Sequence, residues 1–179
     1  MLRIRSRFLF ILAGVLTAGS AHAADSTCKY LADANAKIYT IPTHLYQTET
    51  AAYTGGKPRN SELIYLNNKT YVQVNGKWRV SPVTQKDMED LRKKTEAESL
   101  VNITCRVVRD EAVKGEAATL YSSHQQTPDQ TTDSQIWISK TRGVPLKLEM
   151  DMNVGGGAGK SHRTMTYEYT NVQAPAGVQ

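Results

Sequence analysis

Residues 136–152, I-W-I-S-K-T-R-G-V-P-L-K-L-E-M-D-M, predict one β-hairpin, and the rest of the chain can be interpreted around it. Apolar side chains recur at every second position before and after a central turn, which is the period of a half-buried strand. These apolar positions are Ile136, Ile138, Leu146, Leu148, Met150 and Met152. Most of the residues between them are polar or charged, so the hairpin should have one apolar face and one charged face.

The turn of this hairpin contains Gly143, which can adopt the positive φ that closes a type I turn with a G1 bulge. This turn fixes how the two arms pair. It predicts Ile138 opposite Leu146 and Ile136 opposite Leu148.

The first 23 residues have the composition of a secretory signal peptide. Three arginines precede an apolar run over residues 8–16, and the segment ends in small residues at Ala21-His22-Ala23. We expect cleavage after Ala23 and an exported product. No later segment is long and apolar enough to span a membrane, so we expect a protein that is not membrane-spanning.

The net charge gives little reason to expect a nucleic-acid ligand. The chain has 22 basic and 17 acidic residues, and three of the basic residues lie in the signal segment, which leaves 19 against 17. We therefore predict no nucleic-acid binding. The mature chain is long enough for one domain, which we place at residues 24–173, with a flexible tail at 174–179.

Cys28 and Cys105 are the two cysteines of the chain, and both lie in the mature part. An oxidising compartment favours a disulfide between them. A redox-active pair would have a spacing such as C-x-x-C, which is absent. The sequence therefore predicts a structural bridge from an N-terminal helix to a strand.

Periodicity predicts two helices and a series of strands in the rest of the chain. The helices are expected at 29–37 and 84–98, and the strands at 39–53, 62–66, 69–74, 77–80, 102–109, 116–123 and 163–170. Asn67-Asn68, Asn75-Gly76 and Lys114-Gly115 predict tight turns. The polar run 125–134 predicts a loop. Two interpretations of the weakly amphipathic helix 84–98 stay open: it covers one opening of the sheet, or it connects strands on the surface.

No motif in the sequence indicates catalysis, a metal or a cofactor. Residues 154–161, V-G-G-G-A-G-K-S, approach a phosphate-binding loop, but Val154 stands where that motif needs glycine and a strand follows where it needs a helix. A glycine loop between two strands is the simpler interpretation. His44, His124 and His162 show no paired ligand spacing, so we predict no metal site.

Tyrosine is frequent on the predicted strands. Its ring is apolar along its body and polar at its tip, which suits the wall of an amphipathic pocket. Tyrosines also stabilise sheets by ordinary cross-strand packing, and both interpretations stay open. The candidate pocket residues are Ile136, Ile138, Leu146, Leu148, Met150, Tyr167 and Tyr169.

The order of elements and the hairpin together resemble the outer-membrane lipoprotein carrier superfamily, and especially its short periplasmic members without an assigned activity. The resemblance is most specific in a W-I-x-K-x-x-G-x-P-L-K-x-E pattern at residues 137–149. It implies an α+β fold: a curved antiparallel sheet, or half-open barrel, with an N-terminal helix and one inserted helix. It also implies a periplasmic location and a sheet face that holds acyl chains or meets a partner protein.

The sequence departs from that family in its aromatic residues. The carriers line their cavity with many Phe and Trp, whereas both phenylalanines here, Phe8 and Phe10, lie in the signal segment. We expect a non-enzymatic binding protein for a lipid tail or acylated protein. The alternative is a structural or regulatory domain of the cell envelope, with a self-filled core, that binds an envelope protein. An enzyme is the third hypothesis, with His44 as its candidate residue.

Overall fold

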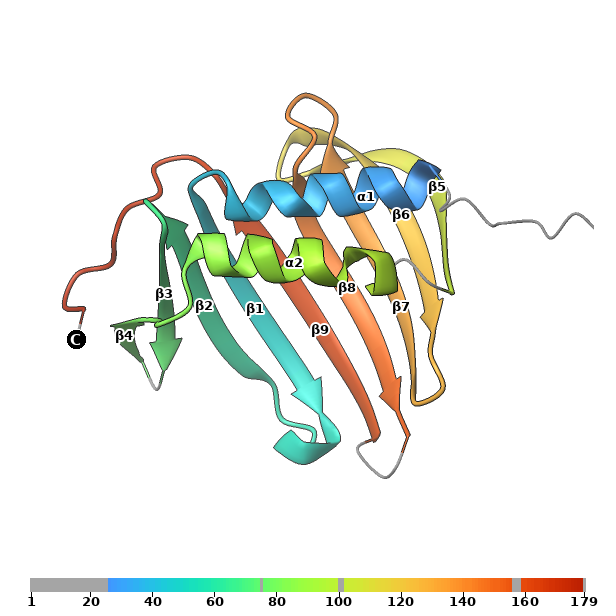
Figure 1. The fold of residues 1–179 in the computed structure, drawn as a ribbon, viewed down its shortest axis with the longest axis horizontal. Helices are drawn as coiled ribbons and strands as arrows, with labels where there is room; N and C mark the ends of the chain where they lie inside the picture. Colours follow the sequence, from blue (N-terminus) through green and yellow to red (C-terminus); the bar gives the residue numbers. More distant parts are fainter. Residues whose placement is uncertain (1–25, 75, 100–101, 156–158, 179) are drawn as a thin grey trace, which may run out of the picture.

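The computed structural model describes residues 26–74, 76–99, 102–155 and 159–178. These residues form two α-helices, two 3₁₀ turns and one nine-stranded sheet in which all neighbouring strands are antiparallel. The sheet is curved and open (Figure 1), because strands β4 and β5 form its two edges and do not pair with each other. The predicted α+β class and curved antiparallel sheet are confirmed.

The strand order in space is β4-β3-β2-β1-β9-β8-β7-β6-β5. The first meander consists of β1 (Thr43–Ala51), β2 (Arg59–Leu66), β3 (Lys69–Val74) and β4 (Lys77–Val80). The second consists of β5 (Ile103–Val113), β6 (Glu116–Gln126), β7 (Gln130–Ser139), β8 (Pro145–Val154) and β9 (Gly159–Glu168). The first and last strands, β1 and β9, join the two meanders at the middle of the sheet.

Both helices lie on the same side of the sheet (Figure 1). Helix α1 (Ser26–Ala36) is followed by the 3₁₀ turn η1 (Lys37–Tyr39), and helix α2 (Gln85–Ser99) connects β4 to β5. The other 3₁₀ turn, η2 (Ala52–Thr54), follows β1. The two helices run beside each other across the strands. Helix α2 thus connects two strands and also lies over the sheet, so the choice between the two interpretations of this segment stays open.

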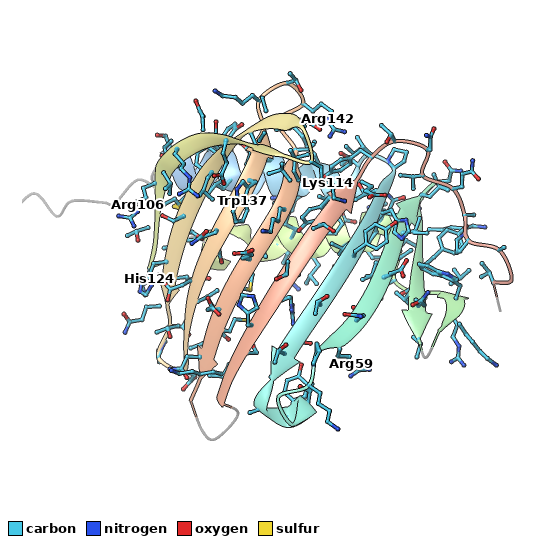
Figure 2. The ribbon with its side chains drawn as sticks, turned by 180° about the vertical axis from the view of Figure 1, so that it is seen from behind. Arg59, Arg106, Lys114, His124, Trp137 and Arg142 are labelled. Carbon is cyan, nitrogen blue, oxygen red and sulfur yellow. A yellow bond between two sulfur atoms is a disulfide. The ribbon has the colours of Figure 1, made fainter. Side chains whose placement is uncertain are left out.

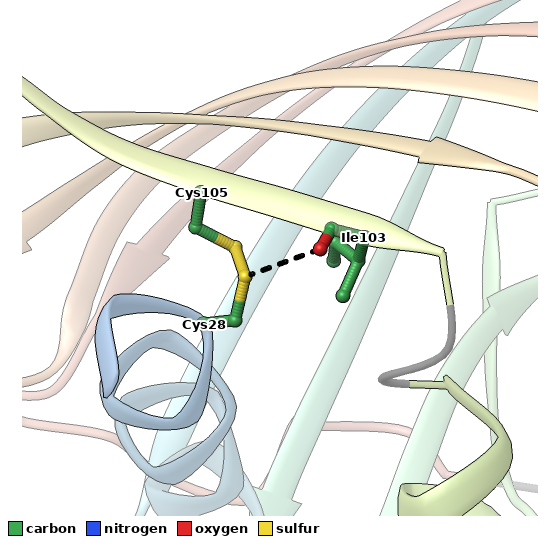
Figure 3. The surroundings of a disulfide bond; sticks show 3 residues. All are labelled: Cys28, Ile103 and Cys105. Atoms are coloured by element: carbon green, nitrogen blue, oxygen red, sulfur yellow. Dashed lines mark hydrogen bonds between the residues drawn. A yellow bond between two sulfur atoms is a disulfide. The ribbon is translucent and has the colours of Figure 1, made fainter. Parts of the chain in front are cut away.

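The predicted disulfide is present and joins α1 to the edge strand β5. The Cα atoms of Cys28 and Cys105 are 5.2 Å apart, and Figure 3 shows the bridge beside the carbonyl group of Ile103. A cross-link over 77 residues removes much of the freedom of the unfolded chain, worth about 4 kcal/mol in the loop-entropy model. The bridge fixes α1 against one end of the sheet.

The hairpin β7–β8 confirms the positive φ predicted at Gly143 and one of the two predicted pairs. Gly143 has a φ of +61°, and Ile136 lies opposite Leu148. The other pair is wrong: a bulge after Trp137 places Ile138 opposite Pro145, and leaves Leu146 as the extra residue. The backbone N–H of Ser139 donates to the Val144 carbonyl. In the predicted register Ser139 would instead lie opposite Pro145, one residue further from the turn.

The loop predicted at 125–134 is also wrong, because β6 and β7 pair along most of it, with Gln126 opposite Thr131. Residues 127–129 alone connect the two strands. The side chains of this segment are polar on both faces of the sheet, so no apolar alternation marks it as strand. The predicted signal segment and part of the turn at Asn75 lie outside the described residues.

Candidate functional site

The two faces of the sheet differ in what covers them. We call the side against α1 and α2 the helix face, and the opposite side the outer face. Cys105, which is bonded to α1, defines the helix face on β5, and side chains alternate between the faces along each strand. Register then assigns every paired residue to one face.

Most of the predicted pocket residues lie together on the helix face. Ile138 packs with Cys28, Leu31 and Ala34 of α1. Leu148 and Tyr167 pack with Ile38 of η1 and Leu45 of β1, and Met150 lies against this second cluster. Ile136 contacts both clusters. Strand alternation was thus sufficient to group five of the seven residues. Whether they line a ligand cavity stays a prediction.

Leu146 and Tyr169 are placed differently, at the end of the sheet near the hairpin turn. The bulge moves Leu146 into a third cluster with Trp137, Leu120 and Ala118. Tyr169 lies past the end of β9, contacts both the second and the third cluster, and donates a hydrogen bond to the carbonyl of Pro145. These two residues close the end of the core.

Methionines extend the apolar helix face beyond the part that α1 covers. Met150 and Met165 pack against the Ile38 cluster, and Met152 follows on the same face of β8. All three are half-buried. We call these three residues the methionine surface. Methionine is flexible and polarizable, so such a surface can adapt to apolar partners of different shape.

Helix α2 lies over this face, but its described side chains bury little apolar surface there. Among its residues with described side chains, 85–94, only Gln85 is buried, while Leu91 is 54% exposed. Its start is held by polar contacts instead. The Gln85 amide donates to the Tyr39 carbonyl at 3.1 Å and accepts from the Asn68 N–H at 2.7 Å. Thr84 and Asp87 cap the helix by donating their backbone N–H groups to each other's side chains.

An ion pair lies on the helix face next to the methionine surface. Arg163, opposite Met150, donates from Nη2 to Oε1 of Glu49 at 2.9 Å. The Glu49 side chain is only 12% exposed, and the Arg163 hydrogen bond lowers the pKa of its carboxyl group. The Nε of Arg163 is buried without a hydrogen-bond partner among the described residues. The methionine surface is therefore bordered, beside Met150, by an ion pair that has one unused donor among the described residues.

The tyrosines of the helix face are buried enough to stay neutral. Burial raises the pKa of Tyr65, Tyr167 and Tyr169. The hydroxyl of Tyr167 donates to Sδ of Met165 at 3.4 Å. A thioether is a weak acceptor, so this deeply placed hydroxyl is only weakly satisfied.

The outer face is polar over most of its area. His124 pairs with Asp133 at 2.7 Å and His162 pairs with Asp151 at 2.8 Å. Asp133 and Asp151 are opposite each other in β7 and β8. These side chains lie in or beside a polar groove of about 360 Å³, which is also lined by Thr104, Arg106, Ser122, Gln135 and Glu149. In the described ranges, no group of three His, Cys, Asp or Glu side chains is placed to hold a metal ion.

One end of the outer face has its own small core around Trp137, seen from behind in Figure 2. The indole N–H donates to Glu111, and the Lys147 ammonium lies 4.6 Å from the ring centroid. The tip of the β5–β6 hairpin is held beside this core by the ion pair from Lys114 to Glu168, and on the opposite face by the ion pair from Lys140 to Asp110. The aromatic ring is buried, so this end is a structural cluster.

The list of candidate pocket residues left out Met152 and Met165, although alternation placed Met152 on the apolar face of the hairpin and Met165 on the same face as Tyr167. Sequence reasoning missed the Glu49–Arg163 pair. The ion pair had no local signal, because its partners are 114 residues apart and meet only through the β1–β9 pairing. His44 pairs with Glu62 at 3.0 Å on the outer face, away from the methionine surface.

The fold and this site define an open-sheet protein with a helix-covered, adaptable apolar face. No protein-family model and no curated protein matches the chain. Solved structures do. The crystal structure of MucB is similar over 86% of this chain with 13% identity and a TM-score of 0.41, and this chain spans 63% of the MucB chain.

Two further structures are similar over 83% of this chain. LprF from Mycobacterium bovis is 10% identical, with 96% of its chain covered and a TM-score of 0.43. A LolA superfamily protein from Nitrosomonas europaea is 10% identical, with 92% covered and a TM-score of 0.30. A protein of the superfamily that the sequence resembles is thus among the similar solved structures. Among the described residues, no helix is long and apolar enough to cross a membrane.

Proposed function

We propose that this protein is a non-enzymatic binding protein of the periplasm that holds an apolar or amphipathic ligand, such as a lipid tail or an acylated protein segment. The observation that carries the proposal is the methionine surface. Its side chains are half-buried on the same face as a core that α1 fills, and α2 lies over that face with little apolar burial among its described side chains. An apolar ligand between the sheet and α2 would contact the methionine side chains on one side and the helix on the other.

The ion pair beside Met150 supports an amphipathic ligand in particular. Arg163 has a buried donor without a partner in the described residues, next to the apolar side chain of Met150. Buried polar groups are usually hydrogen-bonded, so a polar ligand group could supply the missing acceptor. The ligand class that fits is an acyl chain with a hydrogen-bond-accepting head.

The decisive variant is Met150→Glu, with Thr166→Glu as its matched control. Met150 lies on the methionine surface, whereas Thr166 lies on the outer face opposite Lys147, where a carboxylate is tolerated. Binding of a dansyl-labelled fatty acid should weaken at least about tenfold in Met150→Glu, because a charge would face the acyl chain. The control should bind as the wild type does. Equal binding by both variants would count against the proposal.

Export belongs to the same proposal. A product cleaved after Ala23 and carrying the Cys28–Cys105 disulfide would have its N-terminus at Ala24. Intact-mass measurement of the protein from a periplasmic extract checks this: the expected mass starts at Ala24 and lacks the two thiol protons. A product retaining the first 23 residues in the cytoplasm would contradict the location.

The second candidate function is a protein-interaction domain of the cell envelope with a self-filled core. The observation that favours it is the long edge strand β5, where Val107 is 59% exposed and Val108 is 44% exposed at a bulge. Exposed edges and apolar side chains are common contact sites for partner chains. If Val107→Lys abolished capture of an envelope protein while fatty-acid binding was absent from the wild type, this second function would replace the first.

A further inference from the structure

Methionines are the available sulfur groups in the part of the chain that the structure describes. Both cysteines are joined in the Cys28–Cys105 bridge, which leaves no free thiol there. The methionines in the described ranges are Met88, Met150, Met152 and Met165, and all four are half-buried. A small dissolved oxidant can therefore reach thioethers but meets no thiolate in these ranges.

Three of these thioethers belong to one surface. Leu148 lies opposite Met165 and two residues before Met150 on the same face, so Met150 and Met165 both flank its side chain. Met152 follows along β8. A change in the polarity of these sulfurs would therefore alter one continuous surface, and that surface is the proposed ligand site.

The Tyr167 hydroxyl gives Met165 a particular response to oxidation. Tyr167 is 6% exposed, and its hydroxyl donates to the weakly accepting Sδ of Met165 at 3.4 Å. A sulfoxide oxygen at the same side chain is a much stronger acceptor than a thioether. After a small shift of the two side chains, the Tyr167 hydroxyl would donate to this oxygen and stabilise the sulfoxide form of Met165 once it has formed.

We propose that the methionine surface is a site of reversible oxidation by dissolved peroxides, and that its sulfoxide form releases the ligand; this inference rests on the proposed binding function. In the step itself, a sulfur lone pair attacks one oxygen of hydrogen peroxide, forming the S–O bond as the O–O bond breaks. The proton on the transferred oxygen passes to the departing hydroxide. Sulfur loses two electrons, and the peroxide is reduced to water.

The release follows from the polarity of the product. A sulfoxide is strongly polar, so Met150 and Met165 would no longer match an acyl chain, and the ligand would leave S=O groups without hydrogen bonds. A penalty that weakens binding tenfold corresponds to about 1.4 kcal/mol. We expect at least about a tenfold weaker affinity for an acyl ligand after oxidation.

The test uses the mature protein and a dansyl-labelled fatty acid as the probe. Probe affinity is measured before and after treatment with hydrogen peroxide, and peptide mass mapping counts the oxygen atoms added at each methionine. The expected result is oxygen at Met150 and Met165 together with at least about a tenfold loss of affinity. Treatment with the two methionine sulfoxide reductases and a dithiol as electron donor, which is oxidised to a disulfide as each sulfoxide oxygen leaves as water, should reverse both changes.

Two variants assign the effect to the surface. In Met150→Leu/Met152→Leu/Met165→Leu the ratio of the affinity after peroxide to the affinity before it should stay near one, because leucine cannot be oxidised. In Met88→Leu, which changes a methionine of α2 outside the surface, the ratio should fall as it does in the wild type. Equal loss of affinity in all three proteins would overturn the proposal, as would full oxidation of Met150 and Met165 with unchanged binding.

The experiment distinguishes a failure of the release mechanism from a failure of the proposed binding function. A wild-type protein that does not bind the probe before peroxide treatment overturns the binding function, and the release mechanism with it. A protein that binds the probe, but whose Met150 and Met165 resist oxidation until it unfolds, overturns the release mechanism alone.

Discussion

Glu49 shows how much a single residue can depend on distant sequence. Its carboxylate is mostly buried, and it is stabilised there by a hydrogen bond from Arg163, which comes from the last strand of the sheet. The pKa of Glu49 is lowered chiefly by this bond, while burial opposes it. A buried carboxylate of this kind is stable only with its partner, because an unpaired buried charge is costly.

The lowered pKa predicts a loss of stability in acid. Because the folded-state pKa of Glu49 lies below the ordinary value of 4.5, its contribution is present above that value and is lost as pH falls through the folded-state pKa. Glu49→Gln should reduce the free energy of unfolding by about 2 kcal/mol at neutral pH, because a charge-assisted hydrogen bond is removed.

Urea unfolding at a series of pH values checks this expectation. The difference between the wild type and Glu49→Gln should shrink as the pH falls below about 4.5, since protonation removes the same charge from the wild type. A difference that stays constant down to the acid transition would contradict the assignment.

Among the secondary-structure elements, α1 is the one whose position depends on a covalent bond. Its buried side chains, Cys28, Leu31 and Ala34, lie on one stripe of the helix. Leu31 and Ala34 have side chains of modest size. The exposed Tyr30 adds a ring contact with Tyr121, in which the two ring centroids are 5.6 Å apart. A helix of 11 residues with so small an apolar face is held weakly by packing alone.

The disulfide should therefore account for a large share of the stability. We expect Cys28→Ser/Cys105→Ser to lower the free energy of unfolding by about 2–5 kcal/mol in urea unfolding experiments. A reductant provides the matched control: it should destabilise the wild type by a similar amount and leave the double variant unchanged. If the reduced wild type unfolded at the same urea concentration as the oxidised protein, the bridge would not have this role.

At the scale of the whole molecule, the sequence predicted the elements that apolar alternation or turn residues mark, and missed the pairings that no such pattern marks. The β7–β8 hairpin, its turn at Gly143 and the Lys114-Gly115 turn follow from alternation and turn chemistry within a few residues. The disulfide followed from the number of cysteines. The paired ends of β6 and β7 carry polar side chains on both faces and gave no signal.

The candidate site likewise contains some residues whose grouping the sequence predicted and others whose position it did not. Residues on β7 and β8 could be grouped from their spacing, since one hairpin fixes their faces. The displacement of Leu146 could not be predicted, because a bulge of one residue leaves no mark on the apolar alternation. The meeting of Arg163 with Glu49 depends on the β1–β9 pairing, which no local pattern encodes.

The same β1–β9 seam has a consequence for biogenesis. The first strand finds its central partner only when the last strand has been made, so a chain still attached to the ribosome has two separate meanders and no complete sheet. Such a chain cannot complete its fold until synthesis is finished. Late closure would keep the polypeptide threadable, which suits the proposed export through a narrow channel and the formation of the disulfide after it.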